Sequence, residues 1–181
     1  MFFACIKYML KKNKTHSKTG AKADPGDFQA EVVLIEPEIP QNTGSIARTC
    51  AALGCRLNLI EPLGFSLEDR YLRRAGLDYW PLVEVKCYPH LDAFYEVNRE
   101  GRFFYFSKKV ERSYHQAEFR GKVYLLFGKE TRGLPEDFIS ENQDHCFRIP
   151  MRSAARSLNL SNAVSIVLYE AFRQNGFPGL L

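Results

Sequence analysis

The 181-residue sequence has no apolar run approaching the ~20 residues that a helix needs to cross a bilayer. Its first ten residues are apolar, but Lys7 interrupts them. Lysine-rich sequence then follows where a secretory signal would have a cleavage site of small residues. We therefore expect a cytoplasmic protein that has no membrane partner.

The cysteines and histidines lack the spacing of a disulfide framework or a metal site. The five cysteines include no Cys-x-x-Cys pair, and the four histidines are scattered. We expect buried free thiols in a reducing compartment and no bound metal. The cysteines are Cys5, Cys50, Cys55, Cys87 and Cys146. Neither Gly-x-Gly-x-x-Gly nor Gly-x-x-x-x-Gly-Lys occurs, which argues against Rossmann, P-loop and flavodoxin-like nucleotide sites.

Positive charge gathers at the amino-terminal end. The sequence has 25 Lys and Arg against 21 Asp and Glu, a formal net charge of +4. Six lysines and two acids fall in residues 1–28, which leaves 19 residues of each sign in residues 29–181. We predict a flexible basic arm over 1–28, with an organelle transit peptide as an alternative, and one domain over 29–181. Any nucleic-acid affinity of that neutral domain depends on local charge clusters.

From Ala30 onward, short apolar runs alternate with stretches of helical periodicity. This order predicts an α/β fold with a mostly parallel sheet and helices on both faces. The expected strands are Glu31–Glu36, Arg56–Ile60, Leu82–Val85, Phe103–Phe106, Val123–Phe127 and Phe147–Ile149. The expected helices run from Asn42 or Thr43 to Leu53, from Ser66 to Arg74, and over Leu91–Asn98, Pro135–Ser140 and Asn159–Gln174.

Ligands of open parallel sheets bind at the carboxyl ends of strands, so the loops that leave strands are the informative ones. The first such loop, Glu36–Arg48, contains Asn42 and Arg48. From the residues alone, Asn42 is either a helix cap or a site residue. Arg48 is likewise either a surface charge or a functional group.

Two further loops concentrate residues suited to a binding site. Gly128–Pro135 places two glycines around charged residues, which suits close approach of the backbone to a ligand, although a simple turn is an equal alternative. Met151–Ala163 carries more small polar side chains than one helix cap needs. These are Ser157, Asn159, Ser161 and Asn162.

Taken in this order, the three loops resemble the signature of the SPOUT superfamily of RNA methyltransferases. The sequence is more closely similar to bacterial tRNA (cytidine/uridine-34-2′-O)-methyltransferases over roughly residues 30–180. The stretches that carry the resemblance are Glu36–Arg48, Ile60–Asp78, Leu126–Pro135 and Ile149–Gly179. The resemblance implies a deep trefoil knot in the C-terminal part, S-adenosylmethionine as cofactor, and a homodimer in which each site is completed by the partner chain.

The resemblance also implies roles for individual residues. Cofactor contacts would fall at Phe106, Gly128, Ile149 and Ser157. The catalytic and substrate-positioning set would be Asn42, Arg48, Glu130 and Asn159. Four residues depart from the family pattern. Lys129 stands where proline is common, Ala154-Ala155 replace a polar pair, and Phe106 is bulkier than the usual aliphatic residue.

The implied substrate is the wobble ribose in the anticodon stem-loop of a tRNA. Candidate phosphate contacts are Arg70, Arg73 and Arg74, then Lys108, Lys109 and Arg112, although a solvated face explains such clusters equally well. Tyr79 or Trp80 could stack on an unpaired base. The alternatives are action on another RNA, such as ribosomal RNA, and a non-catalytic RNA-binding protein that keeps the knot.

Overall fold

The computed structural model describes residues 28–67 and 79–181. Six strands form one sheet in which every pairing is parallel, in the order β3-β2-β1-β5-β4-β6. The strands are β1 (Gln29–Ile35), β2 (Arg56–Ile60), β3 (Val85–Tyr88), β4 (Arg102–Phe106), β5 (Lys122–Phe127) and β6 (Cys146–Phe147). The α-helices are α2 (Pro40–Leu53), α4 (Leu91–Val97), α5 (Glu136–Glu141) and α6 (Leu160–Gln174). The 3-10 helices are η2 (Trp80–Leu82), η3 (Tyr114–Gln116) and η4 (Gln143–His145).

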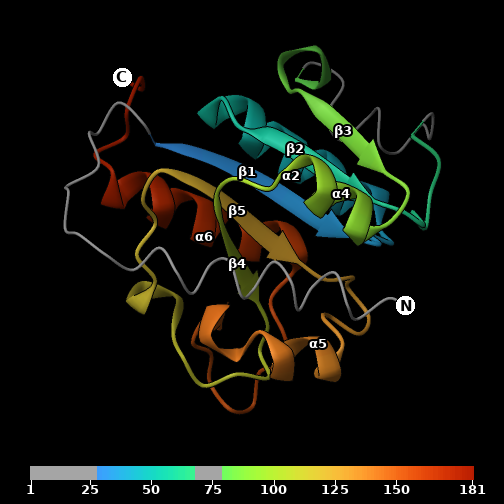
Figure 1. Ribbon diagram of the computed structural model, residues 1–181, viewed down its shortest axis with the longest axis vertical. Coiled ribbons are helices and arrows are strands. Elements are labelled where there is room, and N and C mark those ends of the chain that lie inside the picture. Colours follow the sequence, from blue (N-terminus) through green and yellow to red (C-terminus); the bar gives the residue numbers. More distant parts are fainter. Residues whose placement is uncertain (1–27, 68–78) are drawn as a thin grey trace.

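Helices cover both faces of the sheet, as the sequence predicted (Figure 1). The position of strand β1 explains why its apolar residues do not alternate with polar ones. Val32 and Leu34 face one apolar cluster, which contains side chains of α2 and α6. Val33 lies in a second cluster with side chains of α4 and α5. A strand buried on both sides needs apolar residues at every position, and this requirement explains the continuous run.

Several elements differ from their predicted bounds, among them two strands and one helix. The strand predicted at Leu82–Val85 begins only at Val85, because Pro81 lies in a 3-10 turn that ends at Leu82. The last strand is Cys146–Phe147 rather than Phe147–Ile149. The predicted cap at Asn42 or Thr43 is wrong, since α2 begins at Pro40, where the missing N–H costs nothing. Gly54 ends α2 in the left-handed conformation, as predicted.

Some predictions concern residues that lie outside the described part of the chain. The helix predicted over Ser66–Arg74 falls mostly outside the described residues, as does the arm. Phe28, the first described residue, is buried and packs edge-on against Phe172 at 5.2 Å. In the described part of the chain, no helix is long and apolar enough to span a membrane.

Three of the cysteines are buried free thiols, as expected. Cys50, Cys55 and Cys146 lie inside the protein, and burial raises the pKa of Cys55 to about 12. The expectation is wrong for Cys87, whose side chain is exposed on the edge strand β3. Cys5 lies outside the described residues.

A buried carboxylate anchors the amino-terminal edge of the sheet. Glu31 on β1 accepts hydrogen bonds from Arg56 Nη1 at 3.0 Å and from Asn58 Nδ2 at 2.9 Å, and Lys122 Nζ lies 3.6 Å away. Only 7% of the Glu31 side chain is exposed. Because an ionised carboxylate is costly to bury alone, these partners offset the cost of its burial. They join the neighbouring strands β2, β1 and β5.

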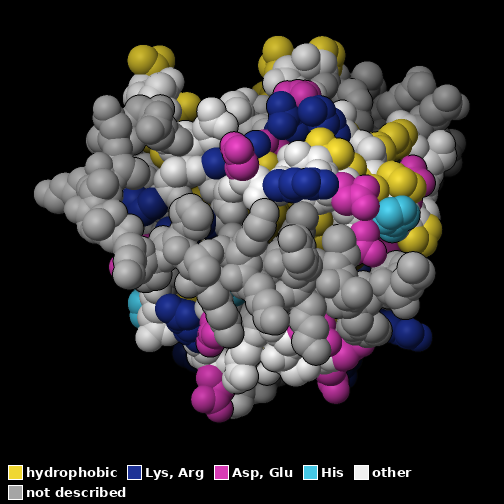
Figure 2. Space-filling view, in the orientation of Figure 1, with side chains coloured by type: hydrophobic (Ala, Val, Ile, Leu, Met, Phe, Trp, Pro, Cys, Tyr) yellow, Lys and Arg dark blue, Asp and Glu magenta, His cyan; other side chains and the backbone are white. Residues whose placement is uncertain are grey.

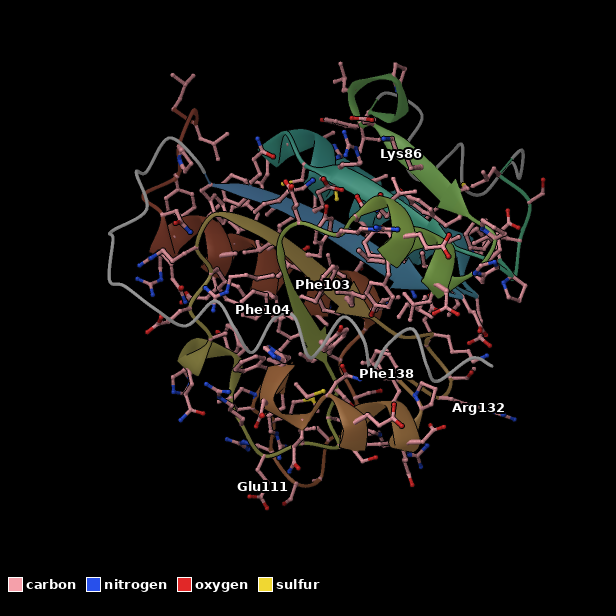
Figure 3. All side chains as sticks on the ribbon, in the orientation of Figure 1. Lys86, Phe103, Phe104, Glu111, Arg132 and Phe138 are labelled. Atoms are coloured by element: carbon pink, nitrogen blue, oxygen red, sulfur yellow. The ribbon has the colours of Figure 1, made fainter. Side chains whose placement is uncertain are left out.

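We expect Arg56→Ala to lower the free energy of unfolding by about 2 kcal/mol, less than for a fully buried pair because Lys122 remains. The matched control is Lys86→Ala on β3 (Figure 3), whose Nζ lies 3.6 Å from the exposed Glu84. That exposed pair should contribute little to the free energy of unfolding. Urea-induced unfolding of both variants measures the difference, and equal midpoints would contradict the assignment of Glu31 as a buried anchor.

Candidate functional site

A cavity of about 370 Å³ lies at the carboxyl ends of the strands. Its walls come from segments that are distant in the sequence: the start of α2, the ends of β4 and β5 with their following loops, and the segment between β6 and α6. Such an edge is the usual ligand-binding position of open parallel sheets. The three loops predicted from the sequence therefore do converge.

A chain of hydrogen bonds joins these loops. Asn159 Nδ2 donates to Asn42 Oδ1 at 2.9 Å, and Asn42 Nδ2 donates to Glu130 Oε1 at 2.9 Å. Glu130 also accepts from the backbone N–H of Glu38 at 2.8 Å and from that of Ile39 at 3.3 Å. Each loop thus holds the next, and we call Asn42, Glu130 and Asn159 the polar chain.

The helix starts explain how the polar chain is positioned. Glu130 lies at the amino-terminal end of α2, where a carboxylate is favoured by unpaired N–H groups and by the helix dipole. Asn159 is the N-cap of α6 and accepts from Ser161 N at 2.8 Å and from Ser161 Oγ at 2.6 Å. Asn42 is buried in the first turn of α2, with its side chain directed to the polar chain rather than to a cap.

A second set of contacts fastens the β1 loop to the β5 loop. Thr131 donates to the Glu38 carboxylate from its side chain at 3.1 Å and from its backbone at 3.1 Å, and these bonds lower the pKa of Glu38. Lys129 Nζ contacts Glu36 Oε2 at 2.6 Å. An ion pair thus fixes the loop at Lys129, the position where the resemblance led us to expect the stiffer proline.

All four residues predicted as cofactor contacts line the cavity. Phe106 and Phe127, at the ends of β4 and β5, stack with ring centroids 4.9 Å apart at 19°. Gly128, Ile149 and Ser157 contribute the remaining predicted positions, one from the β5 loop and two from the segment after β6. Apolar rings and aliphatic groups thus form one part of the wall, and small polar groups form another.

Arg48 is the predicted residue that the fold keeps apart from the others. It is exposed on α2 and does not line the cavity. Its guanidinium lies 4.5 Å from the centre of the Tyr79 ring, and Nη2 donates to the Tyr79 hydroxyl at 3.3 Å. Within one chain, Arg48 is therefore held by Tyr79 and not by the polar chain.

The candidate phosphate contacts have mixed outcomes. Lys108 and Lys109 line the cavity, but Lys108 Nζ donates to the Arg156 carbonyl at 2.8 Å and Lys109 Nζ contacts Glu136 at 3.0 Å. Arg112 Nη1 donates to the Asp144 carbonyl at 2.8 Å. The other three candidates, Arg70, Arg73 and Arg74, lie outside the described residues, as does the side chain of Trp80.

Sequence reasoning missed several residues of the site. Glu38, Thr131 and Leu158 lie in the loops that were singled out, but only the residues that match the family pattern were chosen from them. A Glu–Thr pairing across more than ninety positions has no local signal. Among residues 28–67 and 79–181, no group of three or more His, Cys, Asp or Glu side chains could hold a metal ion.

Comparison with known proteins relates this arrangement to RNA modification. The model of the family described as "SpoU rRNA Methylase family" matches residues 29–169. A curated relative from Saccharophagus degradans, the tRNA (cytidine(34)-2′-O)-methyltransferase, is 50% identical over 149 residues, covering 82% of this chain and 97% of the relative.

Two solved structures share the fold. One, described as "Structural insights into the 2-OH methylation of C/U34 on tRNA", has 49% identity and a TM-score of 0.77, covering 83% of this chain and 97% of the other. The second is the SpoU methyltransferase AviRb from Streptomyces viridochromogenes in complex with the cofactor AdoMet. It is 27% identical with a TM-score of 0.69, covering 86% of this chain and 59% of the other. With most of its residues matched by the family model and half of its aligned residues identical to a curated member, the chain belongs to the SpoU rRNA methylase family.

Proposed function

We propose that this protein is a tRNA 2′-O-methyltransferase that transfers a methyl group from S-adenosylmethionine to the ribose of the wobble nucleotide, cytidine or modified uridine 34. The observation that carries the proposal is the convergence of three strand-exit loops on one cavity, tied by the polar chain. The relative from Saccharophagus degradans and the solved structure on C/U34 methylation support this substrate.

The cavity residues fit S-adenosylmethionine. The volume of about 370 Å³ falls in the range of small-molecule sites. The apolar wall at Phe106 and Ile149 suits a purine ring, and the polar groups near Ser157 suit ribose and amino-acid ends. A Cβ built on Gly128 would lie 2.3 Å from the backbone carbon of Gly133, so only glycine allows the loop to fold this closely beside the cavity.

S-adenosylmethionine supplies an electrophilic methyl group, which leaves the protein to align the ribose hydroxyl and ease the loss of its proton. No histidine lines the described cavity. Glu130 already accepts three hydrogen bonds, so it positions the loops and is poorly suited to accept the proton. Arg48 remains protonated in nearly any environment, and so we assign it to gripping the adjacent phosphate and polarising the hydroxyl.

The proposal includes a homodimer in which Arg48 completes the site of the second copy. Arg48 is exposed on α2, outside the cavity of its own chain. The adjacent helix α6 exposes Ile166 and Tyr169, with 37% and 47% of their surface accessible. An exposed apolar helix face beside a displaced functional arginine supports pairing by a two-fold axis.

The deep trefoil knot and a cytoplasmic location also belong to the proposal. Two contacts support threading of the segment before α6. The Arg156 carbonyl is held by Lys108, and Asn159 is held by Asn42, from different loops. The family membership supports the knot, and the reducing compartment inferred from the cysteine pattern supports the location.

Mass spectrometry of tRNA nucleosides tests the function directly. Cells without this gene should lose ribose methylation at position 34 of specific tRNAs, and the purified protein with S-adenosylmethionine should restore it. If ribosomal RNA loses a ribose methylation instead, the substrate is ribosomal RNA and the assignment to tRNA is wrong. An unchanged profile of both RNAs would contradict the proposed activity.

We expect Gly128→Ala to weaken S-adenosylmethionine binding by at least about tenfold, because the added methyl group displaces the Gly133 backbone from the cavity wall. Gly133→Ala is the control. It has a positive φ of 65° but no atom within 4 Å of the new Cβ, so it should cost stability and leave affinity within a few-fold. Calorimetry measures both affinities, and equal losses would count against the close approach at Gly128.

Mixed dimers test the position of Arg48. Arg48→Ala and Asn159→Ser subunits should each be inactive alone, with serine retaining the N-cap of α6. If Arg48 acts across the dimer, random mixing should restore about a quarter of wild-type activity, since half of the dimers regain one intact site of two. Tagged, purified mixed dimers provide the measurement. No recovery in them would place Arg48 in the site of its own chain.

A further inference from the structure

Three arginines differ from the other exposed cations of the described chain. In residues 28–67 and 79–181, the other exposed Lys and Arg side chains have a hydrogen-bonding or ion-pair partner. The side chains of Arg132, Arg152 and Arg156 have none among these residues. Arg132 has only a long-range attraction to Glu38. We call these three residues the arginine rim.

All members of the arginine rim come from loops that build the cavity. Arg132 lies in the loop after β5 and lines the cavity itself. Its side chain points away from the body of the protein (Figure 3). Arg152 and Arg156 lie in the segment between β6 and α6, where residues 152–159 are all exposed. The fully exposed arginines without a partner in the described residues therefore all come from loops that build one cavity.

The acidic groups near the cavity balance the arginine rim only in part, and Arg132 is attracted to Glu38. Glu136 is paired with Lys109, and Glu36 is paired with Lys129. Glu130 and Glu38 accept hydrogen bonds from within the loops. On the face seen in Figure 2, by contrast, described basic and acidic side chains lie interspersed. A neutral domain thus keeps a local positive excess at its cavity.

We propose that Arg132, Arg152 and Arg156 bind the phosphate backbone of the RNA and guide its ribose to the cavity, an inference that rests on the proposed function. Guanidinium groups bind phosphate through two parallel hydrogen bonds. An arginine without a partner can form these bonds without first breaking a contact within the protein. Ser153, Ala154 and Ala155 between two of the arginines are small and exposed, which lets a phosphate backbone approach closely. Lys108 and Lys109 serve instead to hold the loops.

The salt dependence of RNA binding tests this assignment. The probe is a tRNA anticodon stem-loop transcript, titrated against the full-length protein at several NaCl concentrations. Arg132→Gln/Arg152→Gln/Arg156→Gln should reduce the slope of log affinity against log salt by about two units and weaken binding at least about tenfold. A control variant with the same charge change, Lys86→Gln/Arg99→Gln/Arg173→Gln, should alter both far less, because none of its residues lines the cavity or its loops.

Kinetics and cofactor binding separate this inference from the proposed function. The triple rim variant should raise KM for the RNA about tenfold, with smaller changes in kcat at saturation and in S-adenosylmethionine affinity, because phosphate contacts act mainly on RNA binding. If wild type methylates the tRNA but the rim variant has the same salt slope and KM as the control, the inference is overturned and the function stands. If wild type transfers no methyl group to any tRNA, the proposed function itself fails.

Discussion

The hydrogen-bond chain from Asn159 through Asn42 to Glu130 is the constraint on which the site depends. It joins segments from three different strands, and each partner is itself fixed by a helix terminus. Because the amide of Asn42 donates to one neighbour and accepts from the other, the order of the three residues is set by chemistry as well as by position. The cavity therefore has a defined shape without a metal or a disulfide among its described residues.

The same geometry limits which groups can take part in chemistry. The side-chain oxygens of Glu130 and Asn159 already accept hydrogen bonds from backbone and side-chain donors. We therefore assign these residues to positioning the loops that align the substrates. Arg48, which the family resemblance groups with them, is held by Tyr79 on the outer side of α2. A division between fixed polar supports and exposed cations suits a reaction that requires alignment more than acid–base strength.

Much of the fold was predictable because strands that are buried on both faces have continuous apolar sequences. The apolar runs of β1, β2 and β5 and the glycine that ends α2 were assigned from pattern alone. The edge strands β3 and β6 were misplaced, because the exposed strand Val85–Tyr88 lacks that apolar signal and the buried strand β6 is only two residues long. In the site, the loops were identified but not their connections. Nothing local in the sequence indicates that Thr131 meets Glu38, or that Lys108 is occupied by a carbonyl oxygen.

The pairing of β1 with β5 has a consequence for the synthesis of the protein. Asn42 and Glu130 are 88 positions apart, and Asn159 lies 117 positions beyond Asn42. During translation, β1 therefore cannot pair with β5 until about two thirds of the polypeptide has been made. A chain that ends before β5 lacks the cavity residues of the β5 loop and of the segment that precedes α6. The cavity can therefore form only late in synthesis, after this last segment has been made.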